Sequence, residues 1–184
     1  MTFLQPEVGD THITIYDRRN TEDRIQFPIE PEFETREQVT VWSDHCPAVE
    51  VSKASSDWLS NKLNISCRLM YMPDDSVRPT DPRYSANPDD KVSFADGYPV
   101  LLISEASVKG LNDKIQDEVI PADRFRANII LKGGHAHVED ELKDFQIGTA
   151  LFNGAKPCAR CVMTTIDTQT AKTTKEPLKT LAGY

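Results

Sequence analysis

The chain has 184 residues, 39% of them hydrophobic, which is enough apolar material for one compact core. Its balance is acidic, with 21 Lys and Arg against 29 Asp and Glu and a formal net charge of -8, so no nucleic-acid partner is expected. No apolar run approaches the roughly 20 residues that span a bilayer, and the first residues lack a basic region followed by an apolar stretch. The composition predicts a soluble, cytoplasmic globular protein without a membrane span.

The first part of the chain shows the period-two pattern of strands. β-Branched or aromatic residues alternate in three segments that we predict as strands: His12–Tyr16, Val39–Trp42 and Ser66–Met72. A short helix is expected between the last two strands, with Ser55 or Ser56 as its cap. Its apolar residues share one face, so we expect Trp58 in the core beside Leu59 and Leu63.

The second part begins with a long loop. Residues Pro73 to Asp90 are rich in Pro, Asp, Asn and Ser, and long loops often carry function. The apolar run Pro99–Ile103 predicts a buried strand, and a helix beginning at Ser104 or Ser107 follows, with its inner side formed by Val108, Leu111 and Ile115. Further patterns predict a turn at Gly133-Gly134 and strands at Ala127–Leu131, Ile147–Phe152 and Cys161–Ile166.

Two of the four cysteines form a motif. Cys46 and Cys67 stand alone, whereas Cys158-Ala159-Arg160-Cys161 follows Lys156-Pro157 directly. The neighbouring positive charges favour the thiolate form, which is a soft metal ligand suited to zinc, iron–sulfur clusters and higher-valent thiophilic metals. A dithiol also suits disulfide exchange. Both cysteines could instead be small buried residues at the start of a strand.

Two other groups of polar residues could belong to a site. His135 and His137 could complete a Cys2His2 zinc site, but zinc fingers typically place about three to five residues between their histidines, so exposed turn histidines are favoured. Strand alternation would set Arg126 and Asn128 on one face, with Arg124 just before them. A guanidinium can clamp a phosphate and an amide can read a heterocycle edge, although ordinary surface residues would give the same pattern.

Three segments, in this order and spacing, strongly resemble the MOSC domain: Asp96 to Ser107, Phe125 to Ile130 and Lys156 to Asp167. Within that family they are similar to the mitochondrial amidoxime-reducing component and its bacterial homologues. The resemblance implies an α+β, strand-dominated, β-barrel-like domain with a few short helices. It also implies the pterin-based molybdenum cofactor (molybdopterin), with Cys161 as the protein's molybdenum ligand and Cys158 secondary. Pyridoxal phosphate binding is a further expectation at the level of the family.

The same resemblance implies roles for other residues. It carries Arg126 and Asn128 onto cofactor-binding positions, Ala159 and Arg160 onto the loop around the pterin, and Asp96, Gly97 and Tyr98 onto the loop near the metal. Ala159 and Gly97 replace hydroxyl residues of relatives, so only their backbone can serve. Asp96, which lies in a turn just before a predicted strand, is the expected polar group near the reacting oxygen, and with Cys161 it forms the predicted catalytic pair.

The implied activity is the reduction of small N-hydroxylated substrates, with electrons from an external flavoprotein and an iron–sulfur or heme carrier. We expect a partial N-terminal β-rich region at residues 1–72 and the MOSC core at residues 73–184, with the chain truncated at both ends relative to the family. Two alternatives remain: a carrier that holds cofactor or sulfur without turnover, and a structural domain stabilised by zinc or a disulfide.

Overall fold

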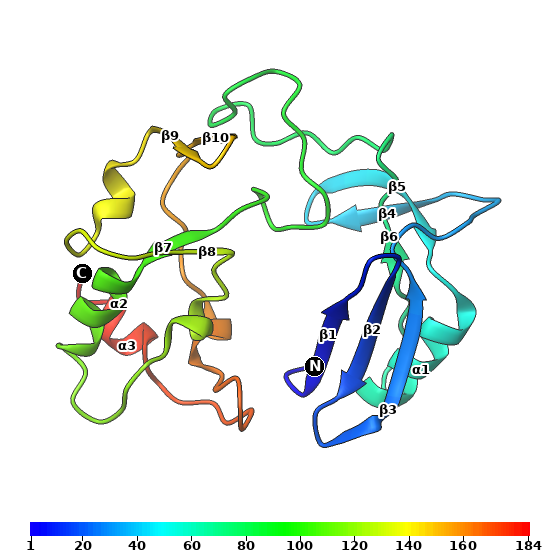
Figure 1. The fold of residues 1–184 in the computed structure, drawn as a ribbon, viewed down its shortest axis with the longest axis horizontal. Coiled ribbons are helices and arrows are strands. Elements are labelled where there is room, and N and C mark those ends of the chain that lie inside the picture. Colours follow the sequence, from blue (N-terminus) through cyan, green and yellow to red (C-terminus); the bar gives the residue numbers. More distant parts are fainter. The chain divides into compact units, whose positions relative to one another are not determined.

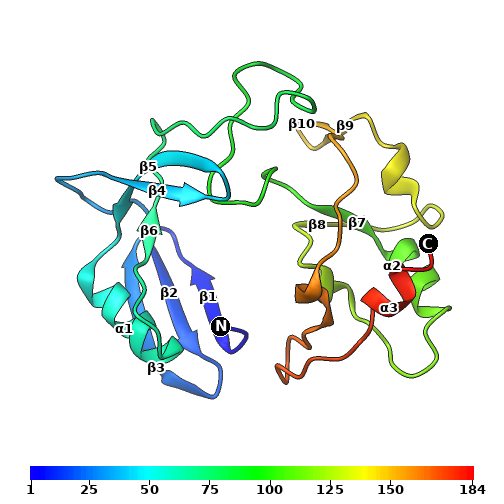
Figure 2. The same ribbon diagram turned by 180° about the vertical axis from the view of Figure 1, so that it is seen from behind.

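The computed structural model describes residues 1–184 and divides into two compact units. Unit 1 comprises residues 1–79 and 91–96, and unit 2 comprises residues 80–90 and 97–184 (Figures 1 and 2). The chain is α+β and rich in strands, as predicted. Its sheets have two or three strands each, and none closes into the barrel that the resemblance implied. No helix has both the length and the apolar character needed to cross a membrane.

The first sheet of unit 1 is an antiparallel meander of three strands. These are β1 (Leu4–Val8), β2 (His12–Asp17) and β3 (Asn20–Pro28). The predicted strand at His12–Tyr16 is confirmed, whereas β1 and β3 were not predicted because their exposed residues hide the alternation. Asp17, at the end of β2, is buried and accepts hydrogen bonds from the backbone and the guanidinium of Arg19.

The second sheet of unit 1 is also antiparallel. It consists of β4 (Glu37–Val41), β5 (Asp44–Glu50) and the two-residue strand β6 (Met70–Tyr71). The predicted strands Val39–Trp42 and Ser66–Met72 therefore exist with different bounds, and Trp42 lies in the turn, 76% exposed and with φ of 58°. The buried residues of this sheet come from β5: they are Cys46, Ala48 and Val49.

Helix α1 (Lys53–Leu63) confirms the helix expected between these strands. Its cap is Ser52, whose hydroxyl accepts from the backbone N–H of Ser55, so the predicted caps Ser55 and Ser56 lie inside the helix and are buried. Trp58 is half-buried rather than in the core, because its indole Nε1 donates to Asp23 of β3 at 2.9 Å. An indole N–H needs a partner when its ring is covered, and a carboxylate at the helix–sheet junction supplies it.

Unit 2 is built on a parallel pair of strands, β7 (Leu102–Ser104) and β8 (Ile129–Leu131). Helix α2 (Glu105–Asn112) and the 3₁₀ helix η1 (Ala122–Phe125) make the connection between them. Parallel strands require a crossover of this kind, and α2 begins at Ser104, one of the two predicted caps. The strand predicted at Pro99–Ile103 begins later, because Pro99 and Val100 are exposed and unpaired in the sheet.

The apolar core of unit 2 lies between α2 and η1. Its buried members are Val108, Leu111, Ile120 and Phe125, with Ile103 and the predicted Ile115 packed against them. Asn112 closes the loop that joins α2 to η1: its amide nitrogen donates to the carbonyl of Ile120 at 2.8 Å, and its amide oxygen accepts from the same residue at 2.7 Å. Phe125, the last residue of η1, is buried in the same core.

The remaining elements of unit 2 are short. They are the 3₁₀ helix η2 (Val138–Glu141), the hairpin of β9 (Asp144–Ile147) and β10 (Ala150–Asn153), the 3₁₀ helix η3 (Val162–Thr165) and α3 (Leu178–Leu181). The strand predicted at Ile147–Phe152 is wrong, because Gly148 adopts a φ of 60° and turns the chain back into β10. The predicted turn at Gly133-Gly134 is confirmed, and so is the predicted long loop from Pro73 to Asp90, which contains no helix or strand.

Asp17 makes the stability of the protein depend on pH in the acid range. Hydrogen bonds from the side chain and backbone of Arg19 hold the pKa of Asp17 well below its ordinary value. A depressed folded pKa contributes stability that is complete above the unfolded value of about 4 and is lost as the pH falls toward the folded pKa. We predict that Asp17→Asn loses less free energy of unfolding than wild type between about pH 6 and about pH 3.

Urea unfolding at the two pH values measures this difference, with Asp57→Asn as control. Asp57 is exposed on α1 and pairs only with Lys53, so that variant should lose stability as wild type does. Equal acid losses in wild type and Asp17→Asn would contradict the prediction.

Candidate functional site

The cysteine motif lies in an irregular segment between β10 and η3. Cys158 and Cys161 are both free thiols and both exposed, so the interpretation as small buried residues at a strand start is wrong. Cys161 has an extended backbone, and its carbonyl accepts from the N–H of Thr164 at 3.1 Å and from the hydroxyl of Thr164 at 2.9 Å. With these bonds, the chain forms the 3₁₀ helix η3, so the predicted strand Cys161–Ile166 is wrong.

Arg160 ties the motif to η1. Its Nη2 donates to the carbonyl of Phe125 at 2.7 Å, and its guanidinium carbon lies 5.0 Å from the centroid of the Phe125 ring. The Nε of Arg160 is buried and has no hydrogen-bond partner. Buried donors are normally satisfied, so this atom marks a place where an acceptor would be stabilised.

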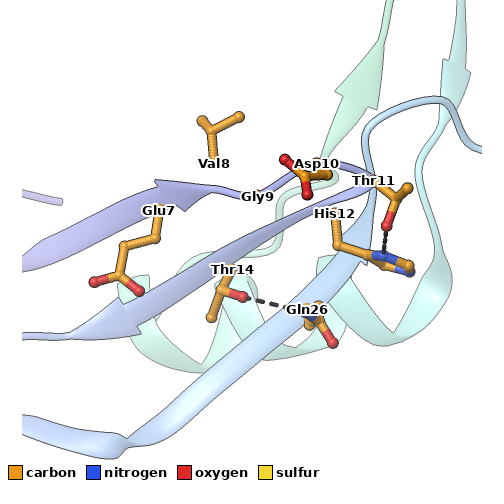
Figure 3. A pocket seen from close by; sticks show the side chains of 8 residues that line it. All are labelled: Glu7, Val8, Gly9, Asp10, Thr11, His12, Thr14 and Gln26. Atoms are coloured by element: carbon orange, nitrogen blue, oxygen red, sulfur yellow. Dashed lines mark hydrogen bonds between the residues drawn. The ribbon is translucent and has the colours of Figure 1, made fainter.

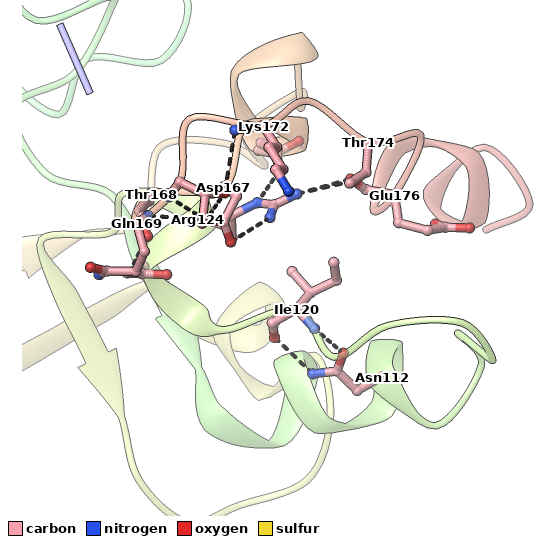
Figure 4. A network of polar contacts seen from close by, with 12 residues as sticks. Asn112, Ile120, Arg124, Asp167, Thr168, Gln169, Lys172, Thr174 and Glu176 are labelled. Carbon is pink, nitrogen blue, oxygen red and sulfur yellow. Dashed lines mark hydrogen bonds and ion pairs between the residues drawn. The ribbon is translucent and has the colours of Figure 1, made fainter. Parts of the chain in front are cut away.

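Arg124, on η1 itself, is buried, at 2% exposure, and belongs to a network of polar contacts (Figure 4). Its Nε donates to the carbonyl of Thr164 at 2.8 Å, and its Nη2 donates to the hydroxyl of Thr174 and the carbonyl of Glu176, both at 3.3 Å. Its Nη1 lies 3.5 Å from Oδ2 of Asp167. Hydrogen bonds from the side chain and backbone of Thr170 lower the pKa of Asp167, and the backbone of Gln169 and the nearby Arg124 charge add smaller contributions.

Arg126 and Asn128 follow in the chain, but they do not alternate along a strand. Arg126 ends η1 in the left-handed conformation, with φ of 56°, and its side chain is exposed. Asn128 precedes β8; its Oδ1 accepts from the N–H of Leu101 at 2.9 Å, and its own N–H donates to the carbonyl of Leu101 at 2.8 Å. The Asn128 side chain thus extends the pairing of β7 with β8, while its amide nitrogen stays available to a ligand.

Lys156, at the start of the cysteine motif, makes a cation–π contact with Tyr98. The ammonium of Lys156 lies 5.5 Å from the ring centroid of Tyr98 and 4.8 Å from that of Tyr84, which comes from the long loop. Burial, and then the charge of Asp81, raises the pKa of Tyr98, whose hydroxyl is buried without a partner. Arg83 bonds Asp81 and holds the pKa of that carboxyl at about 2. A Cβ added to Gly97, just before Tyr98, would meet no atom within 4 Å outside the neighbouring residues.

Asp96 belongs to unit 1, whereas the other predicted site residues belong to unit 2. Its Oδ1 accepts from Nε1 of Trp42 at 3.4 Å. Its carbonyl accepts from Arg78 at 3.0 Å, and the same buried guanidinium also bonds Asp44 and the carbonyls of Ser93 and Ala95. Asp96 is exposed at the end of this ordered segment, and its catalytic role stays a prediction.

The two histidines do not join the cysteines. His135 Nε2 lies 3.2 Å from Glu141, and His137 packs edge-on against Tyr184 with the ring centroids 5.6 Å apart. Both are exposed in a turn, as favoured from the sequence. The structure contains no group of three or more His, Cys, Asp or Glu side chains able to hold a metal ion.

A separate open pocket lies on the first sheet of unit 1 (Figure 3). Its lining residues come from β1, β2, β3 and the turn after β1: they are Glu7, Val8, Gly9, Asp10, Thr11, His12, Thr14 and Gln26. The polar side chains partly satisfy one another, as Thr11 and His12 do at 2.8 Å. None of the predicted site residues lies there.

The residues of unit 2 fit an anionic cofactor with a heterocycle and a thiophilic metal. Cys161 offers an exposed soft ligand, and Arg126 offers an exposed guanidinium. The unpartnered Nε of Arg160 and hydroxyl of Tyr98 are buried donors that a bound polar group could satisfy.

The sequence did not predict the contacts that Arg124 and Tyr84 make at this site. No local signal marks Arg124 in the sequence, because the carbonyls that it bonds lie 40 and 52 residues later.

Comparison with known proteins supports a family assignment. A family model described as the MOSC domain matches residues 89–184, about half of the chain. Mitochondrial amidoxime-reducing component 1 of Homo sapiens is 31% identical over 139 residues, which cover 73% of this chain and 41% of that protein. The corresponding protein of Mus musculus is 34% identical over 135 residues, covering 71% of this chain and 39% of that protein.

A second kind of relative covers the whole chain. Molybdenum cofactor sulfurase of Oryza sativa subsp. japonica is 28% identical over 199 aligned residues, which cover 100% of this chain and 24% of that protein. The chain thus spans about two fifths of the amidoxime-reducing relatives and about a quarter of the sulfurase. Together with the family model, these matches show that the chain belongs to the MOSC domain family.

Proposed function

We propose that this chain binds the molybdenum cofactor (molybdopterin) and forms the cofactor-binding domain of an oxidoreductase that reduces small N-hydroxylated substrates. One observation carries the proposal: the exposed thiol of Cys161 lies in a segment that Arg160 bonds to Phe125, the residue directly before Arg126. This bond joins the segment that carries a soft ligand to the segment that carries an exposed guanidinium suited to a phosphate. The names of the amidoxime-reducing relatives support the substrate class.

Each predicted residue has a role in this proposal. Cys161 is the thiolate ligand of molybdenum, Arg126 binds the phosphate, and the free amide nitrogen of Asn128 donates to the heterocycle. The segment of Ala159 and Arg160 borders the pterin, with Arg160 Nε donating to an acceptor of the bound group. Cys158 is a secondary contact, exposed beside the ligand.

The chemistry is a two-electron reduction. The bound cofactor would supply the electrons that cleave the N–O bond, and the product is the N–H compound and water once two protons are added. Gly97 and Tyr98 border the reacting position, and Asp96 is proposed to hold a proton near the departing oxygen. The electrons come from external carriers, a flavoprotein with an iron–sulfur or heme protein.

A second candidate is a carrier that holds cofactor or sulfur without turnover. The observation that favours it is the full coverage of this chain by the molybdenum cofactor sulfurase relative, together with a second exposed thiol at Cys158. Elemental analysis and an N-hydroxylamine reduction assay separate the candidates. The oxidoreductase requires molybdenum and turnover with a reductant, the carrier lacks turnover, and a structural zinc or disulfide domain lacks molybdenum.

Three further expectations stay predictions: pyridoxal phosphate binding, the division of the chain at residue 72 and the cytoplasmic location.

We predict that Cys161→Ser abolishes molybdenum retention, whereas Cys158→Ser keeps much of it. A hydroxyl is a poor substitute for a soft thiolate, so only the ligand position should be this sensitive. Both residues are exposed, which makes each variant the matched folding control of the other. The measurement is molybdenum per chain after purification from a cofactor-competent host. The opposite ranking would assign the ligand to Cys158.

We further predict that Arg126→Ala weakens cofactor binding without unfolding unit 2. The side chain is exposed, and truncation of surface residues usually changes stability by about 0.5 kcal/mol or less. Loss of one charge-assisted bond to a phosphate should weaken binding by about tenfold or more. Cofactor titration and a circular-dichroism melt measure the two effects. A collapsed melt would show that Arg126 is structural.

A further inference from the structure

Two arginine hydrogen bonds join the segment around Cys161 to the same short helix, η1. Arg160, which precedes Cys161, donates to the carbonyl of Phe125 in η1 at 2.7 Å. Arg124, which belongs to η1, donates to the carbonyl of Thr164 at 2.8 Å. Thr164 in turn bonds the carbonyl of Cys161 through both its N–H and its hydroxyl. The cysteine is therefore held on both sides by bonds that converge on η1.

The contacts of Arg124 extend well beyond Thr164 (Figure 4). Its guanidinium also reaches Thr174, the carbonyl of Glu176 and the carboxylate of Asp167, so it crosslinks the whole segment that follows the cysteine. This segment is largely irregular, with one isolated bridge between Ile166 and Thr173. Buried backbone carbonyls that no sheet or helix partner satisfies need donors, and a planar guanidinium supplies several in a fixed fork.

We propose that Arg124 is a positioning residue that fixes Cys161 relative to Arg126 for cofactor binding. The proposal rests on the proposed function, in which these two residues bind the metal and the phosphate. Arg124 does not touch the cofactor, because its side chain is buried and its donors are directed at the protein's own carbonyls. It acts through Thr164 and Cys161 on one side and through the backbone of η1 on the other. Arg126 lies two residues further along the same chain.

Arg124→Lys is the diagnostic variant. It keeps the positive charge near Asp167, but one ammonium cannot reproduce the fork that spans Thr164 and Glu176 together. The buried Arg78 of unit 1 offers a matched control, since it also bonds several carbonyls but has no contact in the cysteine segment. Arg78→Lys should leave that segment unchanged.

Amide hydrogen exchange by NMR on the metal-free chain tests the proposal. In Arg124→Lys we expect exchange at Thr164 and Ile166 to accelerate by about tenfold or more, because local opening no longer breaks a charge-assisted bond. Amides of α2 near Leu111 should keep their wild-type rates, and Arg78→Lys should leave η3 unaffected. If Arg124→Lys does not fold, Thr174→Val removes one acceptor of Arg124, together with the bond from that hydroxyl to the carbonyl of Glu176, and should accelerate the same amides by a smaller factor.

Equal acceleration in η3 and α2, or the same effect from Arg78→Lys, would show a general structural role and overturn the proposal. Unchanged exchange in η3 would also overturn it. A second experiment measures molybdenum per chain in wild type and in Arg124→Lys, both purified from a host that makes the cofactor. We expect several-fold less molybdenum in Arg124→Lys. Equal molybdenum in the two would overturn the link to cofactor binding. Molybdenum missing from wild type would reject the proposed function instead, while the exchange result still decides whether Arg124 orders the cysteine segment.

Discussion

In each of the two units, an irregular segment depends on hydrogen bonds from a buried guanidinium group. In unit 2, Arg124 satisfies carbonyls on both sides of the loop that follows the cysteine motif. In unit 1, Arg78 does the same for the carbonyls that lead to Asp96. A carbonyl that is neither in a sheet nor exposed to water requires a donor, and arginine can serve several at once. The cost of burying each charge is offset by these bonds and by the neighbouring carboxylate.

The apolar core of unit 2 determines where these bonds can form. Phe125 packs with Leu111 and Ile120, and its carbonyl is the acceptor for Arg160. Core packing therefore fixes η1. Arg124 and Arg160 then join η1 to the cysteine segment. The Cys161 thiol and the Arg126 side chain stay exposed, so a ligand can reach both. This sequence of dependence explains how a domain with few long strands can hold a defined site. In the proposed function, it also separates the residues that would contact the cofactor from those that hold these residues in place.

Sequence patterns predicted the elements whose signals are local. The period-two pattern of β2, the apolar face of α2 and the turn at Gly133-Gly134 all required no distant partner. The strand predicted at Cys161–Ile166 failed because Thr164 and Thr165 bond carbonyls three residues back, which competes with strand formation. Arg124 could not be distinguished from a surface arginine, since its acceptors lie 40 to 52 residues later. The motif residues came from the family resemblance, and the structure adds how Arg160, Phe125 and Arg126 are joined.

Cysteine alkylation followed by mass spectrometry tests directly whether the thiol of Cys161 binds molybdenum. The chain is purified from a cofactor-competent host, and the molybdenum-containing fraction is compared with metal-free protein after brief exposure to iodoacetamide. Both motif thiols are exposed in the protein alone, so both should react when metal is absent. We predict that Cys161 is protected in the molybdenum-containing fraction while Cys158 still reacts. Protection of Cys158 with free reaction of Cys161, or equal reaction of both in that fraction, would contradict it.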